Sequence, residues 1–158
     1  MFDSEKRCVL YGSILAAALV APAIGMATEI EYVSNEDIAT LGPYSPATAF
    51  GDLVFASGQI AIDSKEGKIV GTEVREQTRK ALENLRTVLE ASGSSLEHVL
   101  KVTVYLQNPE DFGPMNEVYA EFFPRNKPAR STVPGVSWGG TVLVEIDAIA
   151  VRIKESAD

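Results

Sequence analysis

Cysteine and histidine are almost absent from this chain of 158 residues. Cys8 is its one cysteine and His98 its one histidine. Residues 28–158 therefore contain no cysteine, which excludes disulfide bonds and thiol chemistry there. A histidine-rich metal site and a Ser-His-Asp triad with a spare histidine are both difficult to build from a single histidine. We therefore expect no metal site.

Positive charge is also scarce. Lysine and arginine number 14 against 22 aspartates and glutamates, so the net charge is −8. An acidic protein is repelled by phosphate backbones, so we expect no binding to nucleic acid. Internal repeats, linkers and low-complexity segments are missing after residue 28. Residues 28–158 are therefore expected to form one domain.

Long apolar runs are missing as well, with one exception near the N-terminus. Residues 8–27 carry no charge, follow the basic residue Arg7 and end in the small residue Ala27. This order predicts a signal peptide over residues 1–27, and an exported protein that is periplasmic in a Gram-negative cell or secreted. The alternative is an uncleaved membrane anchor, because the run could just span a bilayer. Once cleaved, the protein should have no stable membrane association.

The remaining sequence divides into short periodic segments. The longer predicted helix, residues 72–93, starts at the capping residue Thr72, ends at Gly93 and carries one apolar stripe. The stripe consists of Val74, Thr78, Ala81, Leu82, Leu85, Val88 and Leu89. The shorter helix, residues 110–124, has Phe112, Met115, Tyr119 and Phe122 on its inner side. Strands are expected at 52–62, 98–107, 129–133 and 141–153, with a turn or hairpin at 63–71.

This order of elements predicts one sheet with two helices on one face, which is an α+β fold. In the strand at 98–107, Val102, Val104 and Leu106 face one way, and Lys101, Thr103 and Tyr105 face the other. The helices can bury only one face of such a sheet. The other face needs a cover, most simply by copies of the same chain.

Two carboxylates occupy the predicted last strand. Glu145 and Asp147 are two residues apart, so both side chains leave the same face. One interpretation is a partly solvated edge with two acids of no special role. The other is a carboxylate in an apolar cleft, with a raised pKa that suits acid–base chemistry.

Arg130 follows the rigid Pro128 within the short strand at 129–133. We expect this strand to pair with the strand of Glu145, so that the two side chains can be neighbours. Arg130 can be a surface arginine paired with a nearby acid. It can also grip a carboxylate ligand, because the guanidinium offers two parallel hydrogen bonds.

Four further residues are weaker candidates. Tyr44 follows a Gly-Pro turn, and a loop tyrosine can close over a ligand. Gly58 lies inside a strand, where it marks either a β-bulge or a close approach of backbone to ligand. Asn116 is predicted on the shorter helix, where an asparagine is usually solvated. Trp138 is predicted to be a loop aromatic that covers the core.

Five motifs in order resemble the Rid (YjgF) family of enamine and imine deaminases. They are LGPYSPA, ASGQI, NEVYAEFF, KPARSTV and VEIDAIAV, and the resemblance covers roughly residues 31–153. It implies a single chorismate-mutase-like α+β domain with a mixed sheet and two helices on one face. It also implies a homotrimer whose sheets pack inward, with sites in the clefts between subunits. The reaction converts a 2-imino acid to a 2-keto acid and ammonia and needs no cofactor.

The resemblance also assigns roles to individual residues. Arg130 binds the substrate carboxylate and Glu145 activates the hydrolytic water. Tyr44 belongs to the mobile loop over the site, Gly58 and Thr132 line the pocket, and Asn116 lies near the cleft. Thr132 stands where many members carry cysteine, so we expect an altered substrate preference. Trp138 lies in a loop that differs from the commoner Leu-Pro loop and is expected to reshape the pocket rim.

Two other functions stay open at this point. One is a non-catalytic trimer that binds small carboxylates or acts as an extracytoplasmic chaperone. The presence of both Arg130 and Glu145 favours the deaminase, because a pure binder needs the arginine but not the glutamate. The other, a chorismate mutase, depends on fold analogy alone.

Overall fold

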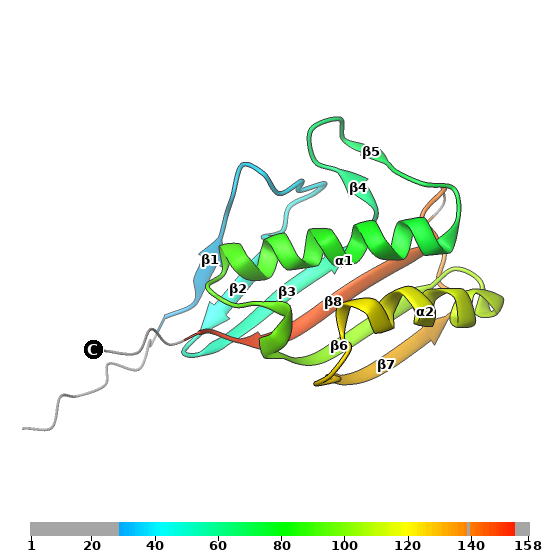
Figure 1. Cartoon of the computed structure of the whole chain (residues 1–158). Helices are drawn as coiled ribbons and strands as arrows, with labels where there is room; N and C mark the ends of the chain where they lie inside the picture. Colours follow the sequence, from blue (N-terminus) through cyan, green and yellow to red (C-terminus); the bar gives the residue numbers. More distant parts are fainter. Residues whose placement is uncertain (1–28, 139, 154–158) are drawn as a thin grey trace, which may run out of the picture.

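The computed structural model describes residues 29–138 and 140–153 (Figure 1). The predicted signal peptide, residues 1–27, lies outside the described residues. The strands and helices, with the labels of Figure 1, are β1 Glu31–Val33, β2 Ala47–Phe50, β3 Leu53–Gln59, β4 Ile62–Asp63, β5 Lys68–Ile69, α1 Val74–Ala91, β6 Val99–Leu106, α2 Phe112–Phe122, β7 Ala129–Pro134 and β8 Val144–Val151. Two short 3₁₀ helices, Leu96–His98 and Pro109–Asp111, precede β6 and α2.

The sheet has six strands in the order β1-β2-β3-β8-β6-β7. Strands β6 and β7 are parallel and the other neighbours are antiparallel. Both helices lie on the same face of this sheet (Figure 1). The prediction of an α+β domain with a mixed sheet and two helices on one face is therefore confirmed. The predicted turn at 63–71 is the β4–β5 hairpin.

Helix α1 buries all seven residues of the predicted stripe, and Gln77 with them. The Gln77 amide donates to the carbonyls of Gly71 and Thr141 and accepts from the N–H of Leu143. This buried amide therefore fastens the segment before β8 to the helix. The predicted cap was wrong. The helix begins one residue later than a cap at Thr72 implies, and the Thr72 N–H donates to the Glu76 carboxylate at 3.0 Å.

Helix α2 covers the other half of the sheet. Met115 and Tyr119 are buried as predicted, and Phe122 is half-buried. Phe112 is 48% exposed, so it is not buried as the inner side of the helix predicts, although its ring lies 5.9 Å from the Arg130 guanidinium of β7. It is the first residue of the helix.

The two faces of the sheet differ in what covers them. In β8, Val144, Ile146, Ala148 and Ala150 are buried beneath the helices, and the alternate residues are only half-buried. We call the helix-free side the open face. On it, Leu53, Phe55 and Val133 are 39%, 42% and 40% exposed. The single chain thus leaves apolar sheet surface without cover, as expected.

Strands β1 and β2 were not predicted. They have three and four residues, too few for a clear period of two. Within the residues that the structure describes, no helix is long and apolar enough to cross a membrane. The same residues contain no cluster of three or more His, Cys, Asp or Glu side chains that could hold a metal ion.

Candidate functional site

Glu145 leaves β8 on the open face and packs directly against Gly58 of β3. A Cβ atom at residue 58 would lie 2.6 Å from Cδ and 2.9 Å from Cγ of Glu145. Carbon atoms in contact are normally about 3.5–4.0 Å apart, so a larger residue at this position would force the glutamate side chain to shift. The β3–β8 pairing is also irregular between Ala56 and Gln59. Gly58 therefore lies at a strand irregularity, which is one of its two interpretations, and its missing side chain leaves room for Glu145.

A cavity of about 480 Å³ opens beside Glu145. Its lining consists of Leu41, Tyr44, Ser57, Gly58, Ile60, Trp138, Val142 and Glu145. Glu145 is the only charged residue in this lining. The cavity thus presents one carboxylate within mainly apolar walls, an arrangement typical of small-molecule sites.

The surroundings raise the pKa of Glu145 above its ordinary value. Burial is the main cause, since it disfavours the charged form. A hydrogen bond from the Trp138 side chain lowers the pKa, and the nearby charge of Asp147 raises it again. A carboxylate with a raised pKa can accept and return a proton more readily near neutral pH. The interpretation of Glu145 as a carboxylate in an apolar cleft is the one that the geometry supports.

Tyr44 lies at the edge of the same cavity. Its hydroxyl accepts a hydrogen bond from the Leu41 N–H at 3.1 Å, and its own N–H donates to the Gly42 carbonyl at 2.9 Å. The ring is 46% exposed. These bonds fold the short loop onto itself and hold the ring where a ligand would enter.

Asp147 shares the open face but does not line the cavity. The Tyr105 hydroxyl donates to its carboxylate at 3.2 Å. The charge of Asp147 is the main cause that raises the pKa of Tyr105. The two acids of β8 therefore have separate surroundings, and only Glu145 faces the cavity.

Arg130 lies on β7 and faces the helices. Its Cζ atom is 4.5 Å from the ring centroid of Tyr119 and 5.9 Å from that of Phe112, both on α2. Burial raises the pKa of Tyr119 to about 12, and the Arg130 charge offsets part of this rise. Tyr119 is therefore neutral at physiological pH and presents its ring face to the guanidinium, a cation–π arrangement.

Thr132 and Asn116 lie on the same side of the sheet as Arg130. Thr132 is two residues further along β7, so it shares the face of Arg130. Asn116 is four residues after Phe112 and three before Tyr119, which places it on the same stripe of α2. Among the described residues, Arg130 forms no salt bridge. Its guanidinium is thus available for an external carboxylate.

The expectation that Arg130 and Glu145 are neighbours was wrong for a single chain. Strand β7 pairs with β6, and β6 separates it from β8. Across β6, Arg130 is level with Ala148, and Glu145 is level with Val133. Strand spacing and rise place the two α-carbons on the order of 14 Å apart, and their side chains leave opposite faces.

Arg130 and Glu145 are separated because of the connection between β6 and β7. Helix α2 joins these strands, and a strand–helix–strand unit makes its two strands parallel neighbours. The predicted order of strand, helix and strand contained this signal. The chain therefore carries two separate groups. We call Glu145, Gly58 and Tyr44 the glutamate group, and Arg130, Thr132 and Asn116 the arginine group.

Two features of the site were not predicted. Trp138 was expected to cover the core and, by the family resemblance, to reshape the pocket rim; it does line the cavity, but its interaction with Glu145 was not predicted. Tyr119 was expected only as a core residue, but its ring also holds Arg130. The available signal for Trp138 was its position in a loop that differs from the Leu-Pro loop commoner in the family. Nothing in the sequence indicated the stacking of Arg130.

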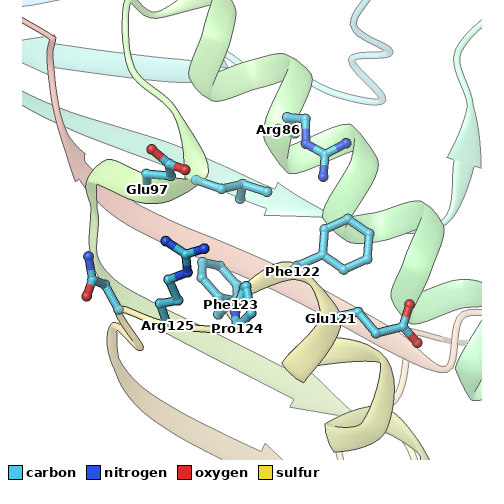
Figure 2. Close-up of a pocket in the computed structure, with 9 residues that line it drawn as sticks. Arg86, Glu97, Glu121, Phe122, Phe123, Pro124 and Arg125 are labelled. Atoms are coloured by element: carbon cyan, nitrogen blue, oxygen red, sulfur yellow. The ribbon is translucent and has the colours of Figure 1, made fainter.

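A second cavity of about 490 Å³ lies on the helix side, where α1, α2 and the loop after α2 meet. Figure 2 shows Arg86 of α1 and Arg125 beside the rings of Phe122 and Phe123. Arg86 lies 5.2 Å from the Phe122 ring centroid. None of the predicted site residues lines this cavity. It mixes arginine and glutamate side chains and offers no convergent set of groups.

Comparisons with known proteins identify the family. The profile of the family described as endoribonuclease L-PSP matches residues 34–152. A RutC family protein of Pyrococcus horikoshii is 51% identical over 112 residues, which are 71% of this chain and 89% of that protein. The 2-iminobutanoate/2-iminopropanoate deaminase of Mus musculus is 38% identical over 114 residues, 72% of this chain and 84% of that protein.

A solved structure agrees with the fold. The crystal structure of E. coli TdcF with bound serine superposes with a TM-score of 0.72 at 35% identity, and covers 78% of this chain and 99% of that one. The resemblance carried by the five sequence motifs is therefore confirmed. The chain belongs to the Rid (YjgF) family, which is also described as the endoribonuclease L-PSP family.

Proposed function

We propose that this protein hydrolyses 2-imino and enamino acids to 2-keto acids and ammonia. The observation that carries the proposal is the division of the site into two complementary groups. The glutamate group offers a proton acceptor in a mainly apolar cavity, and none of the described residues that line it is a cation. The arginine group offers a cation that forms no salt bridge among the described residues. A small 2-imino acid needs both.

The two groups can meet only between copies of the chain. Within one sheet they leave opposite faces, but β7 is an edge strand and can approach the open face of another copy. Association with another copy would bury apolar side chains that are exposed on that face of the single chain, namely Leu53, Phe55 and Val133. We therefore propose a cyclic homotrimer in which Arg130 of one subunit completes the cavity of the next.

The chemistry then follows from the two side chains. An enamine first tautomerises to the imine. Arg130 holds the substrate carboxylate with two parallel hydrogen bonds and so fixes C2 within reach of a water molecule. Glu145 takes a proton from that water as the oxygen bonds to C2. The imine nitrogen is protonated when water adds, so the product is a neutral carbinolamine. Glu145 then gives its proton to the amino group, the C–N bond breaks and ammonia leaves, and the hydroxyl group passes its proton to Glu145 to form the 2-keto acid.

Relatives support this class of ligand. The mouse relative is named a deaminase of 2-iminobutanoate and 2-iminopropanoate, and the E. coli relative was solved with serine. Both names point to small molecules that carry a carboxylate beside a nitrogen-bearing carbon. Hydrolysis of such an imine transfers no electrons and so requires no redox cofactor.

RNA cleavage, which the family description mentions, has less support from this chain. The net charge is −8, and the glutamate group adds a carboxylate where a phosphate would have to bind. The remaining alternative is a non-catalytic trimer that binds small carboxylates through Arg130. It explains the arginine group but gives no use to a glutamate with a raised pKa.

An ammonia-release assay separates these functions. The parent protein should release ammonia from freshly generated 2-iminopropanoate or 2-iminobutanoate faster than buffer does. Glu145→Gln should lower turnover by roughly 10²–10⁴, because the amide cannot accept a proton. Glu97→Gln, which changes an exposed carboxylate in the other cavity, is the matched control and should behave as the parent. A parent that binds 2-keto acids yet releases no ammonia would establish the binding protein instead.

A further inference from the structure

Trp138 lines the Glu145 cavity, and its relation to the Glu145 carboxylate was not predicted from the sequence. It is also the only tryptophan of the chain. Its indole has a single polar atom, an N–H that donates and cannot accept. A side chain of this kind can orient a carboxylate without competing for the proton that the carboxylate must take.

We propose that Trp138 is a positioning residue that holds the Glu145 carboxylate, and that the cavity it walls selects 2-imino acids with apolar side chains larger than methyl. This inference rests on the proposed function and names the substrate class of the same site.

The first support is the way in which Glu145 is held. Gly58 leaves room for the glutamate but offers no side chain to fix it. Trp138 lines the same cavity, and among the described residues its indole is the side-chain donor that acts on the Glu145 carboxylate. A carboxylate has two oxygens, so one can accept from the indole while the other accepts a proton from water. A general base positioned in this way keeps the distance and direction that proton transfer requires.

The second support is the character of the walls. Leu41, Ile60, Val142 and the ring of Trp138 surround the carboxylate with apolar surface. Against these walls a polar or charged substrate side chain would lose water without gaining a partner from the subunit that carries Glu145. The cavity measures about 480 Å³, within the range of sites for ligands much larger than a three-carbon imino acid. An apolar side chain of several carbons uses this space and gains from burial.

The hydrogen bond can be tested by the tryptophan fluorescence of the parent protein, excited at a wavelength that tyrosine does not absorb, since this emission comes from Trp138 alone. Emission should titrate with Glu145, with a midpoint above the ordinary glutamate pKa. Glu145→Gln should abolish this titration, whereas Glu97→Gln should leave it unchanged. An emission that shows no titration in the parent, or the same titration in Glu145→Gln, would overturn the positioning role.

The same role predicts a specific kinetic change in Trp138→Phe, which keeps a ring but loses the N–H. Loss of a hydrogen bond that lowers the Glu145 pKa should move the acidic limb of the kcat profile to higher pH. The value of kcat should fall roughly 10-fold to 100-fold, and KM should change little. Ser137→Ala, an exposed neighbour outside the lining, is the control. An unshifted profile in a folded Trp138→Phe protein would contradict the proposal.

Selectivity is tested on the parent with three imines. The value of kcat/KM for 4-methyl-2-iminopentanoate should exceed that for 2-iminopropanoate by about tenfold or more, and 2-iminoglutarate should be poorest. Equal values, or a preference for the charged imine, would overturn the substrate class while leaving the deaminase function intact. A parent that hydrolyses none of the three would overturn the inference together with the proposed function.

Discussion

Gly58→Ala separates activity from stability more sharply than other single changes in this site. The added Cβ would lie 2.6 Å from Cδ of Glu145, whereas carbon contacts are normally about 3.5–4.0 Å. The carboxylate must therefore move by about 1 Å, because it is a flexible side chain and the strand backbone is not. A shift of that size in a catalytic group typically costs about 10²-fold in rate.

The free energy of unfolding should change much less. Overpacking costs about 1–3 kcal/mol when the neighbours cannot give way, and here the end of a side chain can. Replacing a strand glycine with alanine also gains roughly 0.5–1 kcal/mol, because glycine loses more conformational freedom on folding. The two effects nearly cancel, so we expect a net change within about 1 kcal/mol.

The assays are ammonia release and urea unfolding of the same preparations. Gly113→Ala in α2 is the matched control, because a Cβ at residue 113 meets no atom within 4 Å. It should keep full activity and gain slightly in stability. Equal turnover of Gly58→Ala and the parent would refute the claim that the position of Glu145 limits the reaction. A fall in stability of several kcal/mol would refute the claim that the side chain yields.

Three further predictions concern the arginine and glutamate groups. Arg130→Lys keeps the charge but loses the planar fork of the guanidinium. The value of kcat/KM should fall by a factor equivalent to roughly 2–4 kcal/mol of transition-state binding, and calorimetry should show weakened binding of 2-keto acids. Tyr119→Phe removes a buried hydroxyl that makes no hydrogen bond of good geometry within the described residues. Its free energy of unfolding, measured in urea, should therefore change by less than about 1 kcal/mol, whereas Tyr119→Ala should lose about 3–5 kcal/mol. The pKa of Glu145 is raised, so between its ordinary and its raised pKa the folded state binds more protons than the unfolded state. The free energy of unfolding of the parent should therefore fall as the pH rises through this window. The fall should be smaller in Glu145→Gln.

Elements with strong periodicity were predictable from the sequence. Seven residues at helical spacing placed the buried face of α1, and the alternation in β6 and β8 placed the two faces of the sheet. The same alternation put Glu145 and Asp147 on the open face. Burial periodicity decides these features locally, so the sequence alone contains them.

Features that depend on which strands are neighbours were less accessible. Adjacency of the last two strands in the chain suggested that Arg130 and Glu145 meet, but the parallel crossover through α2 puts β6 between them. The contact between Trp138 and Glu145 joins a loop to a strand, and no local pattern encodes it. The burial of Gln77 follows from its three hydrogen bonds to backbone groups, which become neighbours only in the folded chain.

The central claim is that Arg130 of one subunit completes the cavity of Glu145 in another. Coexpression of Arg130→Ala with Glu145→Gln tests it directly, because each variant lacks a different half of every site. In randomly mixed cyclic trimers, about a quarter of the sites would combine an intact arginine with an intact glutamate. The mixed protein should therefore show about a quarter of the parent's ammonia release, while each variant alone shows almost none. Mixed trimers with no more activity than the separate variants would contradict the shared site.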